Sequence, residues 1–235
     1  MQVYVIKFQI VHLYIIGDKM TKYRDIITTL LARELDESTL MSLRDSILAA
    51  VATHFRYAED AFSNEVIRKL AICNGIYFSV IQGVQDALDN NIFYRLENTE
   101  PKDGIYPVMR LPSFTIVPRR SNTIDSYRKA NYLKDFSIQN KAYEPSTPDL
   151  FDKLDELESS NEDAIFLILD VSVDDEQKVD LKFLLPSSDL KFVHMAIPYE
   201  AVLDTYRVLD DEEYEPEAAK SVLKATLKDL DRRLG

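Results

Sequence analysis

Three apolar runs in the C-terminal half, separated by short polar clusters, predict an antiparallel meander around which the chain is organised. The runs are Ile165–Val173, Val179–Leu185 and Lys191–Ile197. The first is nearly continuous in apolar residues, as expected for a strand that is covered on both faces. The second alternates between apolar and charged residues, which predicts one buried face and one polar face that carries Asp180 and Lys182.

Helical periodicity follows from Thr21 onward, where apolar residues recur at three- and four-residue spacing. A first helix is predicted there, a second is predicted to be capped by Ser38, and a third to begin near Ser63 or Asn64. The apolar stripes of the three helices are Ile26, Ile27, Leu30, Leu31 and Leu35, then Leu40, Leu43, Ile47, Val51 and Phe55, then Ile67, Leu70, Tyr77, Ile81, Val84 and Leu88.

The pair Asn74-Gly75 interrupts the third helix. The sequence allows two structures at this point: a kinked helix, or a helix that ends before a strand at Ile76–Ile81. We favour the kinked helix.

Short strands are predicted between the helices and the meander, at Ile92–Leu96, Ile105–Leu111 and Phe114–Val117. Pro112 and Pro118 bracket the last of these segments. Since proline cannot donate to a strand ladder, the two prolines indicate an edge strand or a series of short strands.

The remaining elements are a linker and the C-terminal helices. Glu144–Pro148 is the best candidate for a linker or long surface loop, and Thr147 is placed to cap a following helix. Two further helices are predicted over Pro198–Leu209 and Glu217–Leu234. The fold class is therefore α+β, with a helical N-terminal region, short antiparallel strands and a C-terminal antiparallel β-meander flanked by acidic helices. The expected regions are 1–19, 20–144 and 145–235, of which the last two are compatible with one domain.

Residues 1–19 are predicted to be either an N-terminal strand or a non-native extension. The apolar stretch Val3–Ile16 is too short to span a bilayer, and no basic region precedes it as in a signal peptide. Gly17–Met20 permits codons that resemble a bacterial ribosome-binding sequence followed by a start codon. We therefore hypothesise that translation starts at Met20, which the N-terminal mass of the natural product would test.

Composition and charge narrow the class of protein. With 46% hydrophobic and 29% charged residues, the composition is that of a globular protein. The net charge of −12 is uneven, since residues 1–148 sum to +1 and residues 149–235 to −13. Such an acidic surface repels nucleic acid and anionic membranes and attracts basic partners. The alternative is a solvated face that maintains solubility.

Several kinds of site lack support in the sequence. There are five glycines and no GxxxxGK[ST] or GxGxxG motif, so no phosphate-binding loop is predicted. The single Cys73 allows no internal disulfide, which suits a reducing cytosol, and its apolar neighbours predict a buried side chain. The histidines fit no metal-ligand spacing, and no cofactor is predicted; they are His12, His54 and His194.

The clearest chemical pattern is a carboxylate on one strand followed by Asp-x-Lys on the next. The three residues are Asp170, Asp180 and Lys182. This pattern resembles the PD-(D/E)xK nucleases, and the resemblance implies that the two acids hold a divalent cation while the lysine helps to activate water. The alternative is an ordinary solvated strand face, since a second Asp-Leu-Lys occurs at Asp189–Lys191.

Residues 119–141 form the only basic segment, and aromatic residues are interleaved with its cations. Cations beside aromatic rings are what single-stranded nucleic-acid binding requires. The candidate binding residues are Arg119, Arg120, Tyr127, Arg128, Lys129, Tyr132 and Lys134. The alternative is that Tyr132, Leu133 and Phe136 pack inward while the cations neutralise the acidic C-terminal third.

Together these patterns favour a non-catalytic, cytoplasmic macromolecule-binding protein of bacterial or phage type. A regulatory, toxin–antitoxin or phage-defence role would suit it. The expected partner is a protein, with nucleic acid possible through residues 119–141 and no membrane association. Two alternatives stay open: the metal-dependent nuclease, and an acidic nucleic-acid mimic whose carboxylates in 152–162 and 210–217 form a row at phosphate-like spacing.

Overall fold

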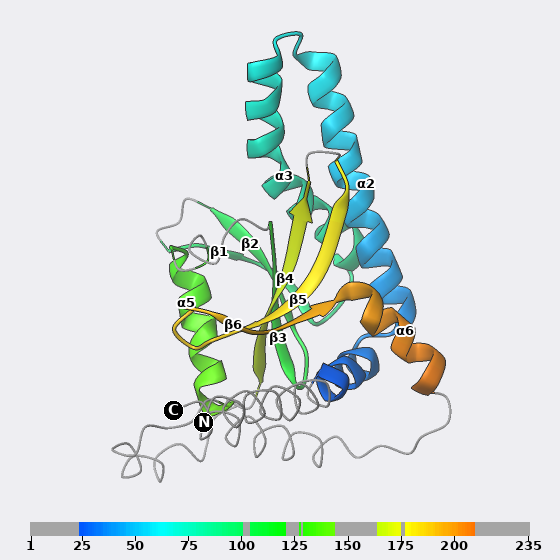
Figure 1. The fold of residues 1–235 in the computed structure, drawn as a ribbon, viewed down its shortest axis with the longest axis vertical. Helices are drawn as coiled ribbons and strands as arrows, with labels where there is room; N and C mark the ends of the chain where they lie inside the picture. Colours follow the sequence, from blue (N-terminus) through cyan, green and yellow to red (C-terminus); the bar gives the residue numbers. More distant parts are fainter. Residues whose placement is uncertain are drawn as a thin grey trace, which may run out of the picture.

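The computed structural model describes residues 24–100, 104–120, 127, 129–143, 164–174 and 177–209. The predicted α+β fold is confirmed, with helices in the N-terminal part and a sheet that the central and C-terminal strands form (Figure 1). A first helix covers residues 24–34. The other elements are α2 (Glu37–Ala61), α3 (Glu65–Leu88), β1 (Tyr94–Asn98), β2 (Ile105–Arg110), β3 (Phe114–Arg120), α5 (Asn131–Ser137), the 3-10 helix η1 (Ile138–Tyr143), β4 (Ile165–Val173), β5 (Val179–Pro186), β6 (Val193–Pro198) and α6 (Tyr199–Leu209).

The strands form one six-stranded sheet in the order β1-β2-β3-β4-β5-β6. Every neighbouring pair is antiparallel except β3 and β4, which run parallel. A parallel pair needs a crossover connection, and here that connection contains α5 and η1. Strands 4 to 6 form the predicted antiparallel meander.

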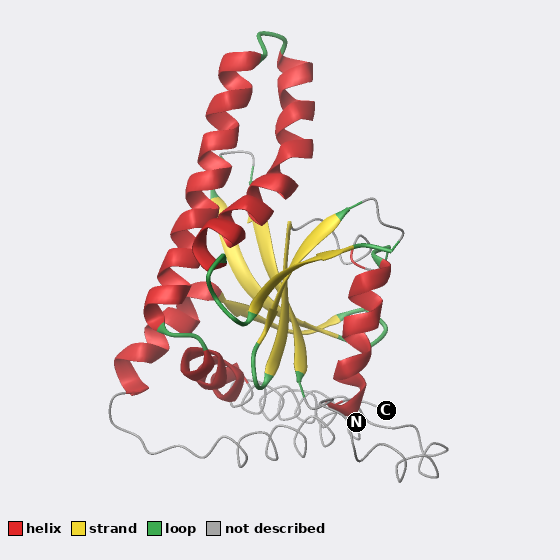
Figure 2. Cartoon of the chain, turned by 180° about the vertical axis from the view of Figure 1, so that it is seen from behind, coloured by secondary structure: helices red, strands yellow, loops and turns green. Residues whose placement is uncertain are grey.

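The sheet separates two apolar cores. Residues of 24–34, α2, α3 and α6 pack with one face of the sheet, and residues of α5 pack with the other (Figure 2). β4 contributes to both cores, since Ile165 and Leu167 lie in the first and Phe166 and Ile168 in the second. The prediction of a strand covered on both faces is therefore confirmed.

α2 and α3 form an antiparallel helical hairpin whose closed end projects beyond the sheet (Figures 1 and 2). Gly83 allows the two helices to approach closely, because a β-carbon there would lie 2.6 Å from the Cα atom of Ile47. α3 begins near Ser63 or Asn64 as predicted, and Asn64 is its cap, since its side chain accepts from the amides of Val66 and Ile67.

Two predicted details of this region are decided by the structure. Ser38 is not the cap of α2, because Asp36 begins the helix and accepts from the Thr39 amide at 2.7 Å. A carboxylate beside the positive helix end is the stronger acceptor of the two. The strand at Ile76–Ile81 does not form, since α3 is helical throughout, and Figure 2 shows it bending partway along.

Of the two alternatives predicted for Phe114–Val117, an edge strand or a series of short strands, the edge strand is wrong. This segment belongs to β3, which lies between β2 and β4 in the interior of the sheet. β2 pairs with β3 only at Thr115 and Ile116, whereas β4 pairs with β3 along the whole length of β3. Pro118 therefore lies where β3 has a partner on one side only, and a missing amide proton is tolerated there.

Several predictions lie outside the described residues. They concern residues 1–19, the linker Glu144–Pro148, the helix that starts at Thr147, the final helix, and the two acidic stretches of the mimic hypothesis. Within the described ranges, no helix combines the length and the apolar character that a membrane span requires.

Candidate functional site

Three charged residues stand in one row across the middle of the sheet. In the strand register, Arg119 of β3 is the partner of Asp170 in β4, and Asp170 is the partner of Lys182 in β5. Each lies two residues from a side chain of the α5-side core, so all three share that face of the sheet. The structure thus brings together residues from both sequence-predicted sets, the nuclease candidates and the basic segment.

Asp170 is the buried member of this row, with 6% of its surface exposed. The hydroxyl of Tyr127 donates a hydrogen bond to its Oδ1 atom. Tyr127 itself is 3% exposed. The tyrosine proposed as a base-stacking platform is therefore a buried partner of the proposed catalytic carboxylate.

Lys182 and Asp180 lie on the same face of β5, and the Lys182 ammonium is 2.5 Å from an Asp180 carboxylate oxygen. The hydrogen bond to Asp180 raises the pKa of Lys182, and the nearby charge of Asp170 adds to this effect. A raised pKa keeps the ammonium protonated. Asp170, Asp180 and Lys182 therefore lie close together, but the lysine pairs with one of the two acids.

Arg119 is held by aromatic side chains. Its Nη1 atom donates to the Tyr132 hydroxyl at 2.6 Å, and its guanidinium lies 5.8 Å and 5.7 Å from the ring centres of Tyr127 and Tyr132. The Tyr132 ring also stacks on Tyr106, with 4.0 Å between centres. Burial raises the pKa of Tyr132. These contacts hold Tyr127 and Tyr132, which follow β3 in the chain, against the sheet.

The other candidates from the basic segment do not gather at this row. Arg120 lies on the other face of β3 from Arg119, and it donates to the carbonyl oxygen of Cys73 in α3. Lys134 is exposed and donates to Asn131 one turn away, while Lys129 is exposed and Arg128 lies outside the described residues. Leu133 and Phe136 are buried, as the inward-packing alternative expects.

The described residues contain no group of three or more histidine, cysteine, aspartate or glutamate side chains placed to hold a metal ion. Two carboxylates stand near each other at the charged row, and one of them is covered by Tyr127. A hard divalent cation usually takes six or more oxygen ligands, some of them water. Asp170 and Asp180 would therefore need oxygens from water or substrate to complete such a site.

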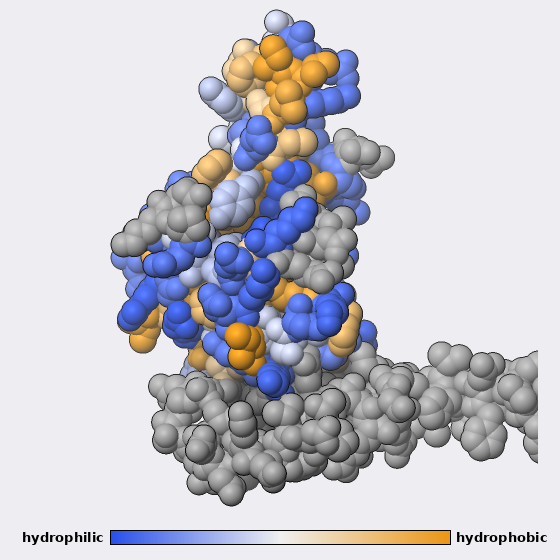
Figure 3. All heavy atoms as spheres, turned by 90° about the vertical axis from the view of Figure 1, so that its left-hand side faces the viewer, coloured by the Kyte–Doolittle hydropathy of each residue, from blue (hydrophilic) through white to orange (hydrophobic). Residues whose placement is uncertain are grey.

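A second surface was not predicted from the sequence. Four large apolar side chains of α3 are 50% to 68% exposed, three of them at the projecting end of the hairpin and Phe78 about three helical turns further along. We call them the α3 patch, and they are Val66, Ile67, Leu70 and Phe78. Figure 3, seen from the side of the hairpin on which α3 lies, shows apolar surface gathered at that end.

The exposure of Ile67 and Leu70 corrects the sequence prediction, which placed both in a buried stripe. Leu88 lies about five helical turns beyond Leu70 on the same side of α3, and it is fully buried. The apolar stripe of this helix is therefore longer than the sheet that covers it. A sequence pattern reports that a face is apolar, but it does not report how far the covering layer extends.

The end of the covered part of α3 is marked by two contacts with the sheet. The Tyr77 hydroxyl donates to the carbonyl oxygen of Ile105 at the start of β2, and Arg120 of β3 reaches Cys73. Cys73 is exposed, which corrects the prediction that it is buried. It lies on the part of α3 that leads to the uncovered end.

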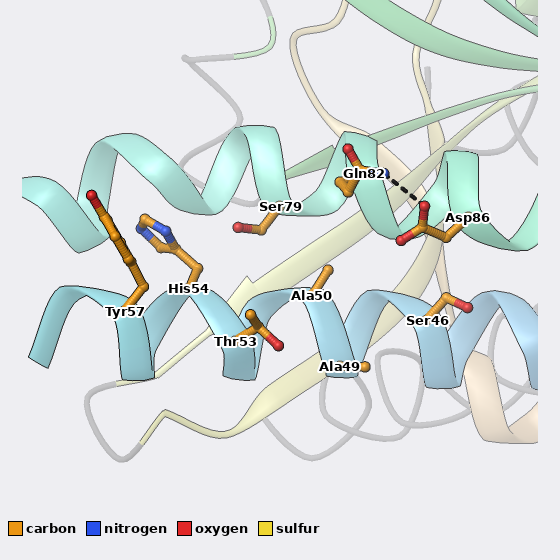
Figure 4. A pocket seen from close by; sticks show the side chains of 9 residues that line it. All are labelled: Ser46, Ala49, Ala50, Thr53, His54, Tyr57, Ser79, Gln82 and Asp86. Carbon is orange, nitrogen blue, oxygen red and sulfur yellow. Dashed lines mark hydrogen bonds between the residues drawn. The ribbon is translucent and has the colours of Figure 1, made fainter. Parts of the chain in front are cut away.

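A groove of about 530 Å³ runs between α2 and α3, lined by small and polar side chains (Figure 4). Three of its polar side chains form hydrogen bonds within the protein. Gln82 donates to Asp86 at 2.6 Å, and Ser79 donates to the Gly75 carbonyl within α3. Gln82, Asp86 and Ser79 are therefore already engaged by other groups of the protein.

Comparison with protein-family models, with curated proteins and with solved structures found no match to this chain. Its class is defined by the fold, which is an α+β arrangement around a mixed six-stranded sheet. Function has to be inferred from the charged row on the sheet and the α3 patch.

Proposed function

We propose that this is a non-catalytic macromolecule-binding protein that uses the α3 patch to contact a protein partner. The observation that carries the proposal is the exposure of four large apolar side chains on one projecting helix. Large exposed apolar patches on soluble proteins mark interaction surfaces, because leaving them in water is unfavourable. A single cysteine without a disulfide suits a reducing compartment such as the cytoplasm.

The internal contacts of the basic segment favour a protein partner over nucleic acid. Tyr127 is buried, and Tyr132 is stacked on Tyr106, so neither ring is available to a base. Arg119 and Arg120 both donate to groups of the protein itself. Regulation, toxin–antitoxin pairing and phage defence are settings in which such a protein would act.

Photo-crosslinking in cells that express the full chain tests the proposal. Phe78 is replaced by p-benzoyl-phenylalanine, which keeps a large aromatic side chain in the patch. The same replacement at Phe192, which is exposed near the start of β6, is the matched control. We expect protein adducts from position 78 and none from position 192. Equal adducts from both positions, or none from position 78, would overturn the proposal, and adducts with nucleic acid would change the class of partner.

The metal-dependent nuclease is the second candidate. It is favoured by one observation, which is that Asp170, Asp180 and Lys182 share one face of the sheet at neighbouring positions. The test is cleavage of DNA and RNA with and without Mg²⁺. Loss of cleavage in Lys182→Ala, but not in Lys191→Ala from the second Asp-Leu-Lys, would support it. Absence of magnesium-dependent cleavage in the native protein would remove it.

A further inference from the structure

We propose that the partner of the α3 patch is a second copy of this chain, bound in an antiparallel contact centred on Asn74. The inference rests on the proposed function, because it uses the same patch. Three features of the patch point to self-association: the order of its side chains, its central asparagine and its local charge.

The order of side chains along α3 is self-complementary. Val66, Leu70, Asn74 and Phe78 follow at four-residue intervals, so they form one ridge on the helix surface, and Asn74 is exposed between the two large apolar residues. Two such helices that cross in opposite directions at Asn74 place Leu70 of each chain against Phe78 of the other. Every apolar side chain next to the centre then has an apolar partner.

Asn74 suits the centre of a two-fold contact. Its side-chain amide carries both donors and an acceptor, so it can pair with the same group in another chain. A single asparagine within an apolar helix contact fixes the register at some cost in stability. An asparagine at the middle of the ridge is therefore compatible with a copy of itself, whereas an unrelated apolar groove would leave the amide without a partner.

The local charge also favours a second copy. The net charge of −12 comes from residues 149–235, which sum to −13, so that acidic part of the chain repels another copy. Residues 54–78 are neutral, because three cations balance three anions: Arg56, Arg68 and Lys69 against Glu59, Asp60 and Glu65. A two-fold contact uses the same surface on both chains, so it requires a patch without net charge. A basic partner, in contrast, would be drawn to an acidic surface.

The test uses the full chain and measures its mass in solution by sedimentation equilibrium over a concentration series. We expect a reversible dimer for the native protein. Leu70→Glu and Phe78→Lys should each weaken dimerisation by about tenfold or more, because each places a charge against an apolar side chain. Ile138→Glu, at a residue as exposed as Leu70 but outside the patch, is the control that should leave the dimer unchanged.

Mixing the two variants tests the register. In a mixed dimer the new carboxylate faces the new ammonium at one contact, while the other contact keeps its native leucine and phenylalanine. We therefore expect the mixture to form dimers more tightly than either variant alone. A variant that merely failed to fold would not be rescued in this way.

Cys73 supplies an independent readout, since it is the single cysteine and is exposed one residue from Asn74. A short bis-maleimide should crosslink the native dimer, and Leu70→Glu should reduce the yield of crosslinked product at the same protein concentration. A monomer at all concentrations, or a dimer that survives both patch substitutions, would overturn the inference. If the native protein is monomeric while position 78 still crosslinks to another protein, the second copy is excluded and the proposed function stands.

Discussion

The imidazole ring of His54 occupies the space that a β-carbon would take if position 75 held any residue other than glycine. A β-carbon built on Gly75 would stand 2.0 Å from two atoms of that ring. The His54 Nε2 atom is also 3.2 Å from the carbonyl oxygen of Ala71, one turn before Gly75 in α3. The glycine that interrupts the helical pattern is therefore the place where α2 packs a ring against α3, and Figure 4 shows the His54 side chain directed toward that helix.

We expect Gly75→Ala to lower the free energy of unfolding by about 1–3 kcal/mol through overpacking, although alanine is the better helix former. In a His54→Ala background the ring is gone, so the same change should raise stability by up to about 1 kcal/mol. Urea unfolding of the four proteins measures both effects. An identical effect of Gly75→Ala in the two backgrounds would show that the ring and the glycine are not coupled.

The hydrogen bond from Tyr127 to Asp170 should be a stabilising contact. Tyr127→Phe keeps the ring and removes one donor from a buried carboxylate, so we expect a loss of about 1–3 kcal/mol in the free energy of unfolding. Tyr132→Phe is the control. Its hydroxyl accepts from Arg119 at a partly exposed position, so a smaller loss is expected. A larger loss for Tyr132→Phe would contradict this ranking.

Asn140 joins the crossover to two strands through its buried side chain. Its Nδ2 atom donates to the carbonyls of Phe166 and Pro186 at 3.0 Å and 2.8 Å, and its Oδ1 atom accepts from the Phe166 amide at 2.8 Å. Asn140→Ala leaves these groups unsatisfied, so we expect a loss of about 3 kcal/mol or more by chemical denaturation. Asn131→Ala, at an exposed position, should change stability by less than about 0.5 kcal/mol.

The loop before β6 should contribute a pH-dependent part of the stability. The Lys191 ammonium lies 2.7 Å from the Asp189 carboxylate and, with the Ser187 hydroxyl and the Lys191 amide, lowers the pKa of Asp189 to about 2. The unfolded pKa is about 3.9, so this contribution is present above about pH 4 and is lost as the pH falls toward 2.

The measurement for this loop is thermal unfolding of the native protein and of Asp189→Asn between about pH 5 and pH 2. The difference between the two proteins should shrink as the pH falls. Because the pair is largely exposed, we expect an effect of less than about 1 kcal/mol. A difference that stays constant over this range would show that the carboxylate charge does not contribute.

Local patterns in the sequence predicted most of the described elements, although no helix was predicted at Asn131–Ser137 or Ile138–Tyr143. The continuous run of β4 and the alternation of β5 predict their burial because side chains alternate across a strand, and the caps and spacing of α3 predict a helix. The start of α3 near Ser63 or Asn64 was predictable because a capping side chain acts on neighbouring residues. These inferences depend on groups that are close in the chain.

Only the tertiary structure decided which residues meet. Arg119 and Asp170 stand side by side because β3 pairs in parallel with β4, and no local pattern specifies the partner of a strand. Leu70 and Leu88 have the same apolar character on the same helix, but only Leu88 lies in the packed core. The sequence by itself determined which faces are apolar, while the extent of the packed layers determined which of those faces remain available for binding.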